Sequence, residues 1–316
     1  MKKVISLLFA VLLLSACGDR SEKDRINIAI VGTARTPYWN DVELGAKAAG
    51  ERLGVSVRFF APVEENPASW QIREIGELIS TPLDGLAFAA ADPKSLTPVI
   101  LKAMQSEIPC VAMDTDMGKS RHVYIGTGDY SAGEQAGEEL VSLLESKGKI
   151  AIVASFASDI DFRKRVLGFR DALADNADME ITATIEKENN VVQTSDVEVL
   201  LGSYPDLDGI FCASDSDAIA VAEAVQQADK AGKIDIVSIG ESPGLLKYVK
   251  DNVIQATVAR KPYRIGYLSI LVLHNMVKVG IQNALRILPE SGIIDTGIVV
   301  VTPMNISEQL TELGTE

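Results

Sequence analysis

The sequence has very few of the side chains on which metal centres and acid–base catalysts depend. Its 316 residues include only two histidines, His122 and His274, and three cysteines with no Cys-x-x-Cys spacing. A zinc site needs several cysteine or histidine ligands, and a serine or cysteine nucleophile needs a neighbouring base. We therefore expect no metal, no cofactor and no enzymatic activity.

Basic charge and long apolar runs are scarce as well. The chain has 30 Lys and Arg against 44 Asp and Glu, which argues against a nucleic-acid partner or a charge-driven contact with an anionic membrane. After residue 16, no apolar run approaches the roughly 20 residues that a membrane-spanning helix needs. Hydrophobic residues make up 47% of the chain, which is enough for the cores of two globular domains.

The first 17 residues have the pattern of an export signal. Lys2 and Lys3 precede an apolar stretch, residues 4–14, that is too short to span a bilayer. The following Leu-Ser-Ala-Cys resembles the lipobox of bacterial lipoproteins, and this resemblance implies cleavage before Cys17 and acylation of that cysteine. The alternative is an ordinary secretory signal followed by a chance cysteine. We predict a signal peptide over residues 1–16, a lipid-anchored tether over 17–25, and a location in the cell envelope, at the periplasm or the cell surface.

The other two cysteines, Cys110 and Cys212, lie inside apolar runs that indicate buried strands. A disulfide between them is conceivable in an oxidising compartment. They belong to separate, similar units of the sequence, however, so we favour two buried free thiols.

From Ile26 onward, short β-branched runs alternate with longer amphipathic segments. One series of runs covers 26–31, 55–60, 85–90, 108–113 and 122–126, and a second covers 149–156, 181–185, 209–214 and 234–239. This alternation is typical of parallel sheets with helices on both faces. Nine or ten strands exceed one comfortable sheet. We therefore predict an α/β fold of two doubly wound parallel-sheet lobes, with a boundary at residues 126–129 and helix ends at Gly54, Gly148 and Gly232.

Several short motifs imitate enzyme sites. Residues 240–244, GESPG, match the GxSxG nucleophile elbow, but the elbow needs the backbone N–H of the residue after the serine, and Pro243 has none. Residues 126–128, GTG, begin like a dinucleotide fingerprint but lack its third glycine. The runs DTD, DLDG and DSD lack the remaining ligands of a calcium loop. We expect no catalytic site from any of them.

One set of residues after the predicted strands forms a coherent binding site. Tyr38 and Trp39 stand at a helix start, while Asp114, Glu241 and Arg260 each follow an apolar run. In doubly wound sheets, ligands bind beyond the carboxyl ends of the strands, where these residues would meet. Aromatic faces cover the C–H surface of a polyol, and charged side chains bond its hydroxyl groups. The expected ligand is therefore a small hydroxylated solute.

Over residues 26–303 the chain resembles the type 1 periplasmic solute-binding proteins of the ribose- and galactose-binding group. The resemblance rests on TPYWNDVELGAKAAGERLGV, IPCVAMDTD, YIGTGDYSAGEQAGEEL, RKRVLGFRDAL, IFCASDSDAIAVAEAVQQADKAG and VIQATVARKPYRIGYLSI. It implies two α/β lobes joined by a three-crossing hinge, with the solute closed between them. Residues 26–127 and about 260–288 would form the N-terminal lobe. Residues 128–259 and about 289–316 would form the C-terminal lobe.

The resemblance also implies individual ligand contacts. The residues that match the family's binding positions are Tyr38, Trp39, Asp114, Arg165, Glu241 and Arg260. Four further candidate positions depart from the ribose-binding pattern, which has other polar residues there: Thr36, Ala89, Thr115 and Ser214. These departures argue against ribose as the ligand, but they leave a pocket that would suit another hydroxylated solute.

The implied function is extracytoplasmic capture of a sugar or sugar-like molecule for delivery to an ABC permease. The alternative is a ligand-sensing receptor of the same fold, which would present its closed form to a chemoreceptor or a sensor kinase. Either role requires a membrane partner, with the protein itself a monomer held to the membrane through lipid on Cys17. An extracytoplasmic enzyme is the least favoured reading, because no catalytic constellation is present.

Overall fold

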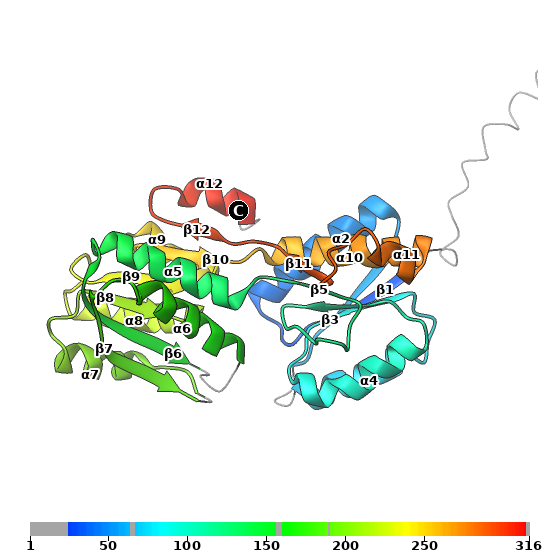
Figure 1. Ribbon diagram of the computed structural model, residues 1–316, viewed down its shortest axis with the longest axis horizontal. Helices are drawn as coiled ribbons and strands as arrows, with labels where there is room; N and C mark the ends of the chain where they lie inside the picture. The colour runs from blue at the N-terminus through cyan, green and yellow to red at the C-terminus, as the bar shows by residue number, and fades with distance from the viewer. Residues whose placement is uncertain (1–24, 64–66, 156–159, 189, 314–316) are drawn as a thin grey trace, which may run out of the picture.

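The computed structural model describes residues 25–63, 67–155, 160–188 and 190–313, in two α/β lobes (Figure 1). The first lobe contains β1 (Asn27–Val31), α2 (Pro37–Leu53), β2 (Ser56–Phe60), α3 (Pro67–Leu78), β3 (Gly85–Phe88), α4 (Pro93–Gln105), β4 (Cys110–Met113), β5 (Val123–Gly126), α10 (Pro262–Val279), α11 (Ile281–Leu285) and β11 (Ile293–Asp295). The second contains α5 (Asp129–Leu143), β6 (Lys147–Ser155), α6 (Ile160–Leu173), β7 (Asp178–Lys187), α7 (Thr194–Ser203), β8 (Gly209–Cys212), α8 (Asp215–Gln227), β9 (Asp235–Ile239), α9 (Pro243–Lys250), β10 (Ala256–Ala259), β12 (Val299–Val301) and α12 (Ile306–Leu313).

Each lobe is built on one sheet. The strand order is β11-β5-β4-β3-β1-β2 in the first lobe and β12-β10-β9-β8-β6-β7 in the second. The pairs are parallel except for β10 and β12, which are antiparallel. The predicted fold of two doubly wound parallel-sheet lobes is confirmed.

The central strands are apolar along their whole length because helices cover both faces of each sheet. Strands β3, β4 and β8 are buried at every residue. In the first lobe, one face packs against α2 and α10, for example through Val42 and Ile265. The other face packs against α3 and α4 through Ile75 and Ile100. Buried parallel strands with two covered faces have this continuous hydrophobic pattern.

Two helix pairs are packed so tightly that only glycine fits at the contact. A Cβ on Gly45 of α2 would lie 1.9 Å from the carbonyl oxygen of Tyr263 on α10, and one on Gly266 would lie 1.9 Å from that of Val42. In the second lobe, a Cβ on Gly133 of α5 would lie 1.9 Å from the carbonyl oxygen of Arg165 on α6. Both pairs lie beside the space between the lobes, so their packing positions the residues that face it.

Within the described residues, the chain crosses between the lobes three times. The crossings are residues 127–128, 260–261 and 296–298. Thr127 and Thr296 tie the first and third crossings together, with their hydroxyl oxygens 3.0 Å apart. The expected boundary near residue 288 is wrong, because β11 pairs in parallel with β5 and keeps the chain in the first lobe as far as Asp295. Strands β11 and β12 have three residues each, too few to show a pattern in the sequence.

The predicted helix ends are correct at one position out of three. Gly54 ends α2 in the left-handed conformation, with φ at 68°. Gly148, however, lies within β6, and Glu145, at φ 50°, makes the turn after α5. Helix α8 ends at Gln227, before Gly232. A non-glycine residue thus takes the left-handed conformation at a turn where the sequence favoured glycine.

Cys110 and Cys212 are buried free thiols on β4 and β8, in different lobes, as predicted. Burial raises the pKa of the Cys110 thiol to about 12. Cys17 and the predicted signal peptide lie outside the described residues. Among the helices that the structure does describe, none combines the length and apolar character needed to cross a bilayer.

Candidate functional site

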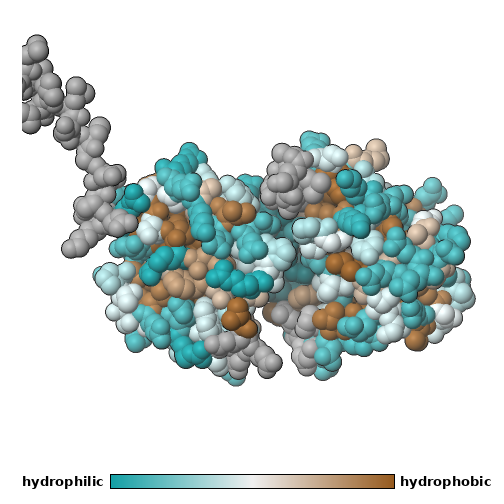
Figure 2. All heavy atoms as spheres, turned by 180° about the vertical axis from the view of Figure 1, so that it is seen from behind, coloured by the Kyte–Doolittle hydropathy of each residue, from teal (hydrophilic) through white to brown (hydrophobic). Residues whose placement is uncertain are grey.

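A cleft of about 530 Å³ lies between the two lobes. Figure 2 shows it as a hollow between them, and its volume is within the range of small-molecule sites, roughly 300–1,000 Å³. Its lining is provided by loops that follow the strands, by the first turns of helices and by the hinge. Among the described residues, the aromatic and charged side chains that line it are Tyr38, Phe162, Arg165, Arg260, Asp41, Asp114, Asp129, Asp161, Asp215 and Glu241.

The first lobe places Tyr38 in this cleft through the start of α2. Thr36 is the N-cap, its hydroxyl accepting a hydrogen bond from the Trp39 nitrogen at 3.5 Å, and Pro37 follows at the first helical position. The Tyr38 hydroxyl donates to Asp114 Oδ1 at 2.6 Å. Burial, followed by the charge of Asp114, raises the pKa of Tyr38 well above its usual value. Tyr38 is therefore a neutral hydrogen-bond donor.

Asp114 reaches the cleft because the chain turns sharply at the end of β4. Its φ is 61°, in the left-handed region that a non-glycine residue rarely adopts. Two hydrogen bonds hold the turn, from the Asp114 nitrogen to the Ile125 oxygen at 3.1 Å and from the Tyr124 hydroxyl to the Asp114 carbonyl at 2.9 Å. Such a backbone persists only where its surroundings enforce it, and it is common at binding sites.

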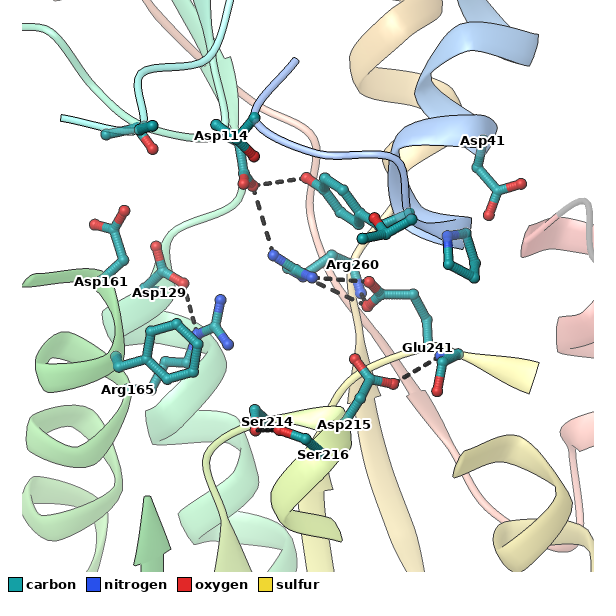
Figure 3. A pocket seen from close by; sticks show the side chains of 18 of the residues that line it. Asp41, Asp114, Asp129, Asp161, Arg165, Ser214, Asp215, Ser216, Glu241 and Arg260 are labelled. Atoms are coloured by element: carbon teal, nitrogen blue, oxygen red, sulfur yellow. Dashed lines mark hydrogen bonds and ion pairs between the residues drawn. The ribbon is translucent and has the colours of Figure 1, made fainter. Parts of the chain in front are cut away.

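Arg260, in the second crossing, joins the two lobes (Figure 3). Its Nη2 donates to Glu241 Oε1 at 2.9 Å, and its Nη1 lies 3.5 Å from Asp114 Oδ1. The guanidinium also lies over the Tyr38 ring, 4.3 Å from the ring centre. Asp114 belongs to the first lobe and Glu241 to the second, so this arginine contacts both walls of the cleft.

The second lobe contributes a separate ion pair. Arg165 Nε donates to Asp129 Oδ1 at 2.7 Å, and its Nη1 donates to the Ala213 oxygen at 3.0 Å. The guanidinium lies 4.7 Å from the centre of the Phe162 ring. Only 6% of Arg165 is exposed, so the ion pair with Asp129 is what stabilises its buried positive charge.

Asp215 stands at the first turn of α8, directly after its N-cap Ser214. Its Oδ1 accepts a hydrogen bond from the Ser242 nitrogen at 2.7 Å, which ties α8 to the loop after β9. Burial, and after it the nearby charge of Glu241, raise the pKa of Asp215. Hydrogen bonding from Ser242 and the charge of Arg260 act in the opposite direction, and no ion pair of Asp215 occurs in the described part of the chain.

The sequence profile described as "Periplasmic binding protein domain" matches residues 28–281. The chain belongs to this family. Among its relatives, the D-allose-binding periplasmic protein of Escherichia coli (strain K12) is 26% identical over 280 residues, which cover 85% of this chain and 90% of the relative. The D-ribose/D-allose-binding protein of Pseudomonas aeruginosa is 27% identical over 335 residues, covering 96% and 99%.

A solved structure has a similar fold. The solute-binding protein of an ABC transporter from Burkholderia graminis C4D1M, in complex with D-arabinose, is 29% identical to this chain. The TM-score is 0.79, and the match covers 89% of this chain and 96% of that one. The family, the two lobes and the crossings between them identify a type 1 periplasmic binding protein.

In this family member, most of the predicted site residues lie around the cleft. Five of the six main candidates line it: Tyr38, Asp114, Arg165, Glu241 and Arg260. Three of the four further candidates do so as well: Thr36, Thr115 and Ser214.

Trp39 and Ala89 lie elsewhere, which corrects their predicted placement in the cleft. Trp39 is 4% exposed and belongs to the core of the first lobe. Its indole Nε1 donates to the Thr33 hydroxyl at 2.9 Å, and its ring packs edge-on against Tyr38. Ala89 is fully buried because its nitrogen continues the strand ladder to the Val31 oxygen, which turns its side chain into the core. The cleft wall there is formed by the next residues, 90–91.

The sequence analysis missed several lining residues. Phe162 is the aromatic ring of the second lobe, and Asp41, Asp129 and Asp161 add carboxylates. A usable signal existed for Phe162, because it stands in the first turn of a helix that follows a strand, as Tyr38 does.

The enzyme-like motifs have structural roles. Ser242 of GESPG is the N-cap of α9, its hydroxyl accepting a hydrogen bond from the Leu245 nitrogen at 3.3 Å. His122 accepts a hydrogen bond from the Cys110 nitrogen through its Nδ1. No group of three or more metal-ligating side chains occurs in the part of the chain that the structure describes.

Proposed function

We propose that this protein is a lipid-anchored receptor outside the cytoplasm that captures a sugar or sugar-like solute and delivers it to an ABC permease. The carrying observation is the cleft itself, which brings an aromatic ring and carboxylates from each lobe, an arginine from the second lobe and an arginine from the hinge into one small-molecule cavity. The names of the relatives, which are D-allose- and ribose-binding proteins, support a hydroxylated solute.

The lining suits such a solute physically. The rings of Tyr38 and Phe162 offer apolar faces from opposite lobes, while the ion pairs of Arg165 and Arg260 hold charged oxygens and nitrogens in place for hydroxyl groups. A solute that contacts both lobes favours the closed arrangement, because only that arrangement gives it both sets of contacts. Closure is the signal that a permease would recognise.

The site residues act together in this proposal. Tyr38 covers one face of the solute, Asp114 and Glu241 accept hydrogen bonds from its hydroxyl groups, and Arg165 and Arg260 donate. Thr36, Thr115 and Ser214 add shorter polar contacts at the rim.

A thermal-shift panel of pentoses, hexoses and polyols tests the proposal on protein that begins after Cys17. At a hundredfold excess over its dissociation constant, a ligand stabilises the native state by about 2.7 kcal/mol. We expect Asp114→Asn to lose the shift, and Asp175→Asn, which removes an exposed carboxylate that is not among the residues lining the cleft, to keep it. If no compound shifts the unfolding temperature, the sugar proposal is wrong.

The anchor has its own test. In cells that export the full chain, Cys17→Ser should move the protein from the membrane fraction to the soluble fraction and abolish its labelling by a radioactive fatty acid. Unchanged labelling would contradict acylation of Cys17 without affecting the proposal for the cleft.

A further inference from the structure

A glutamine behind the first-lobe wall of the cleft connects two of the loops that form this wall. Gln71, on α3, is fully buried and is not among the described residues that line the cleft. Its Nε2 donates to the Gly32 oxygen at 2.9 Å and to the Ala89 oxygen at 2.7 Å. Its Oε1 accepts a hydrogen bond from the Ala91 nitrogen at 3.0 Å. One side chain thus bonds the backbone of the loops after β1 and β3.

These bonds lie just beyond the end of the sheet. The last residue pair in the ladder between β1 and β3 is Val31 with Phe88. After this pair the two backbone segments separate, and they continue into α2 and α4. The residues of these two loops that line the cleft are Thr33, Thr36, Ala90 and Ala91. Gln71 therefore holds the loops together where the backbone ladder no longer does.

The three bonds require an amide group at this position. A glutamine side chain offers two N–H donors and a carbonyl acceptor, which here match two backbone oxygens and one backbone N–H. A carboxylate has no hydrogen to donate to the two carbonyl groups, and a hydrocarbon side chain has neither donor nor acceptor. Buried polar groups that are fully hydrogen-bonded stiffen their surroundings, whereas unpaired ones are costly. The chemistry of Gln71 therefore suits a fixed spacing between the two loops.

A chain of contacts connects Gly32 with the aromatic ring in the cleft. Gly32 packs so closely against Trp39 that a Cβ there would lie 3.2 Å from the indole ring. The next residue, Thr33, accepts a hydrogen bond from Trp39 Nε1 at 2.9 Å. The Trp39 ring packs edge-on against Tyr38, with 5.3 Å between the ring centres, and Tyr38 donates to Asp114. A shift of the Gly32 carbonyl would therefore be passed on through Trp39 to Tyr38.

We propose that Gln71 is a positioning residue of the solute site. It sets the distance between the loops after β1 and β3, and through Trp39 it fixes the place of Tyr38 in the cleft, without touching the solute. This rests on the proposed function, because it concerns how the first lobe presents its wall to the solute. Groups that bind a solute must be held to within about 0.5 Å of their working geometry, so a loosened wall should cost affinity.

Hydrogen exchange tests the bond between Gln71 and Ala91 in the unaltered protein. The Ala91 side chain is exposed, so its backbone hydrogen would exchange quickly with solvent if the loop were not held. Because this N–H donates to Gln71 Oε1, we expect slow exchange by NMR in the absence of solute. Fast exchange would overturn the inference, whether or not variants of Gln71 fold.

Acrylamide quenching of Trp39 fluorescence tests the positioning without a ligand. The chain has two tryptophans, so Trp70→Phe leaves Trp39 as the only one. Trp39 is 4% exposed, and acrylamide should therefore quench it weakly. We expect Gln71→Met in this background to raise the quenching constant several-fold, because the loop before α2 is no longer held. Gln71→Glu, which has no N–H for the Gly32 and Ala89 oxygens, should act in the same direction.

Two control variants separate positioning from a general loss of stability. Asp84→Ala removes the acceptor of the Asn27 N–H, a bond of 2.7 Å that connects the starts of the same two strands at the opposite edge of the sheet. Ile75→Ala removes a fully buried side chain one turn further along α3. Both should leave Trp39 quenching near its original value. Equal quenching in Gln71→Met and in these controls overturns the inference.

Calorimetry on the same variants measures the consequence for binding. The probes are D-ribose, D-allose, D-arabinose, D-glucose and D-galactose. We expect Gln71→Met to weaken the binding of any active probe by about tenfold or more, and Asp84→Ala and Ile75→Ala to leave it unchanged. An unchanged affinity in Gln71→Met, or an equal loss in Ile75→Ala, overturns the inference and leaves the proposed function standing. If no probe binds the unaltered protein, the sugar proposal fails, and the quenching result alone decides whether Gln71 positions the wall.

Discussion

The two lobes line the cleft with the same arrangement of side chains. Each places an aromatic ring in the first turn of the helix that follows its first strand, Tyr38 on α2 and Phe162 on α6. Each ring is covered by an arginine, with Arg260 at 4.3 Å from the Tyr38 centre and Arg165 at 4.7 Å from the Phe162 centre. Each lobe thus has, at the cleft, an aromatic ring with an arginine guanidinium over its face.

The difference lies in what each arginine holds together. Arg165 bonds Asp129 and the Ala213 carbonyl, which both belong to the second lobe. Arg260 belongs to the hinge and contacts Asp114 of the first lobe and Glu241 of the second. One arginine therefore stabilises the interior of a lobe, and the other couples the lobes to each other.

The largest expected effect comes from breaking the pair inside the second lobe. Arg165→Met leaves Asp129, whose side chain is 9% exposed, as a buried charge without a partner. We expect this change to lower the free energy of unfolding by about 3–5 kcal/mol. Urea unfolding measures it.

The control for this prediction is the double variant Arg165→Met/Asp129→Leu. Because it removes both charges, it should recover most of the lost stability. A double variant as unstable as the single one would show that Arg165 stabilises the lobe through packing rather than through its charge.

Glycine-to-alanine substitutions test whether the helix pairs of both lobes are equally intolerant of a Cβ atom at the helix contact. Gly45→Ala and Gly168→Ala would put a Cβ at 1.9 and 2.1 Å from the backbone oxygens of Tyr263 and Tyr130. Because backbone must move in both, we expect each to lower the unfolding free energy by about 1–3 kcal/mol. Gly202→Ala on α7 meets nothing within 4 Å and should instead stabilise by about 0.5–1 kcal/mol. Thermal unfolding of the three variants decides; a destabilised Gly202→Ala would undermine the argument.

Removing either of the two aromatic rings should change the affinity for the ligand rather than the free energy of unfolding. We expect Tyr38→Ala to weaken ligand binding by more than about tenfold, because it removes a ring worth roughly 0.5–1.5 kcal/mol and frees Asp114 from its hydroxyl donor. Phe162→Ala removes a ring that carries no hydroxyl group and should cost less than tenfold in affinity. Calorimetry with any ligand found in the panel measures both. Equal losses would show that the Tyr38 hydroxyl is irrelevant.

The smallest expected effect is a pH dependence at Asp41. Its pKa is raised from 3.8 to about 6 in the folded state, so the folded protein binds more protons between these values and its stability falls as pH rises through that window. Asp41→Asn should therefore stabilise the protein near pH 7 by at most about 1 kcal/mol, since solvent screens a half-exposed group. The gain should vanish near pH 3.5. Urea unfolding midpoints measured from pH 3.5 to pH 7 test this prediction, with Asp175→Asn as the control variant. The same gain in stability at both ends of this range would contradict the raised pKa of Asp41.

The sequence predicted the architecture well because the strands are buried on both faces and therefore read as continuous apolar runs. The third crossing was misplaced because β11 and β12, at three residues each, carry no such signal. In the site, Asp114 and Arg260 could be predicted because each ends an apolar strand. Trp39 could not be told from Tyr38, because neighbours on a helix point about 100° apart, and which of two rings faces the cleft depends on tertiary packing.

The crossings also determine the order in which the lobes can fold. The first lobe receives α10, α11 and β11 only from residues 262–295, after the chain has completed the second lobe as far as β10. Until then, the face of the first sheet that packs against Ile265 and Leu273 is covered by α2 without α10, and β5 is an open edge. A chain that emerges from its N-terminus therefore has five of the six strands of the second sheet, β6 to β10, before the first lobe receives α10. Neither lobe is complete until the chain has passed through both, because β12 and α12 of the second lobe follow β11 of the first.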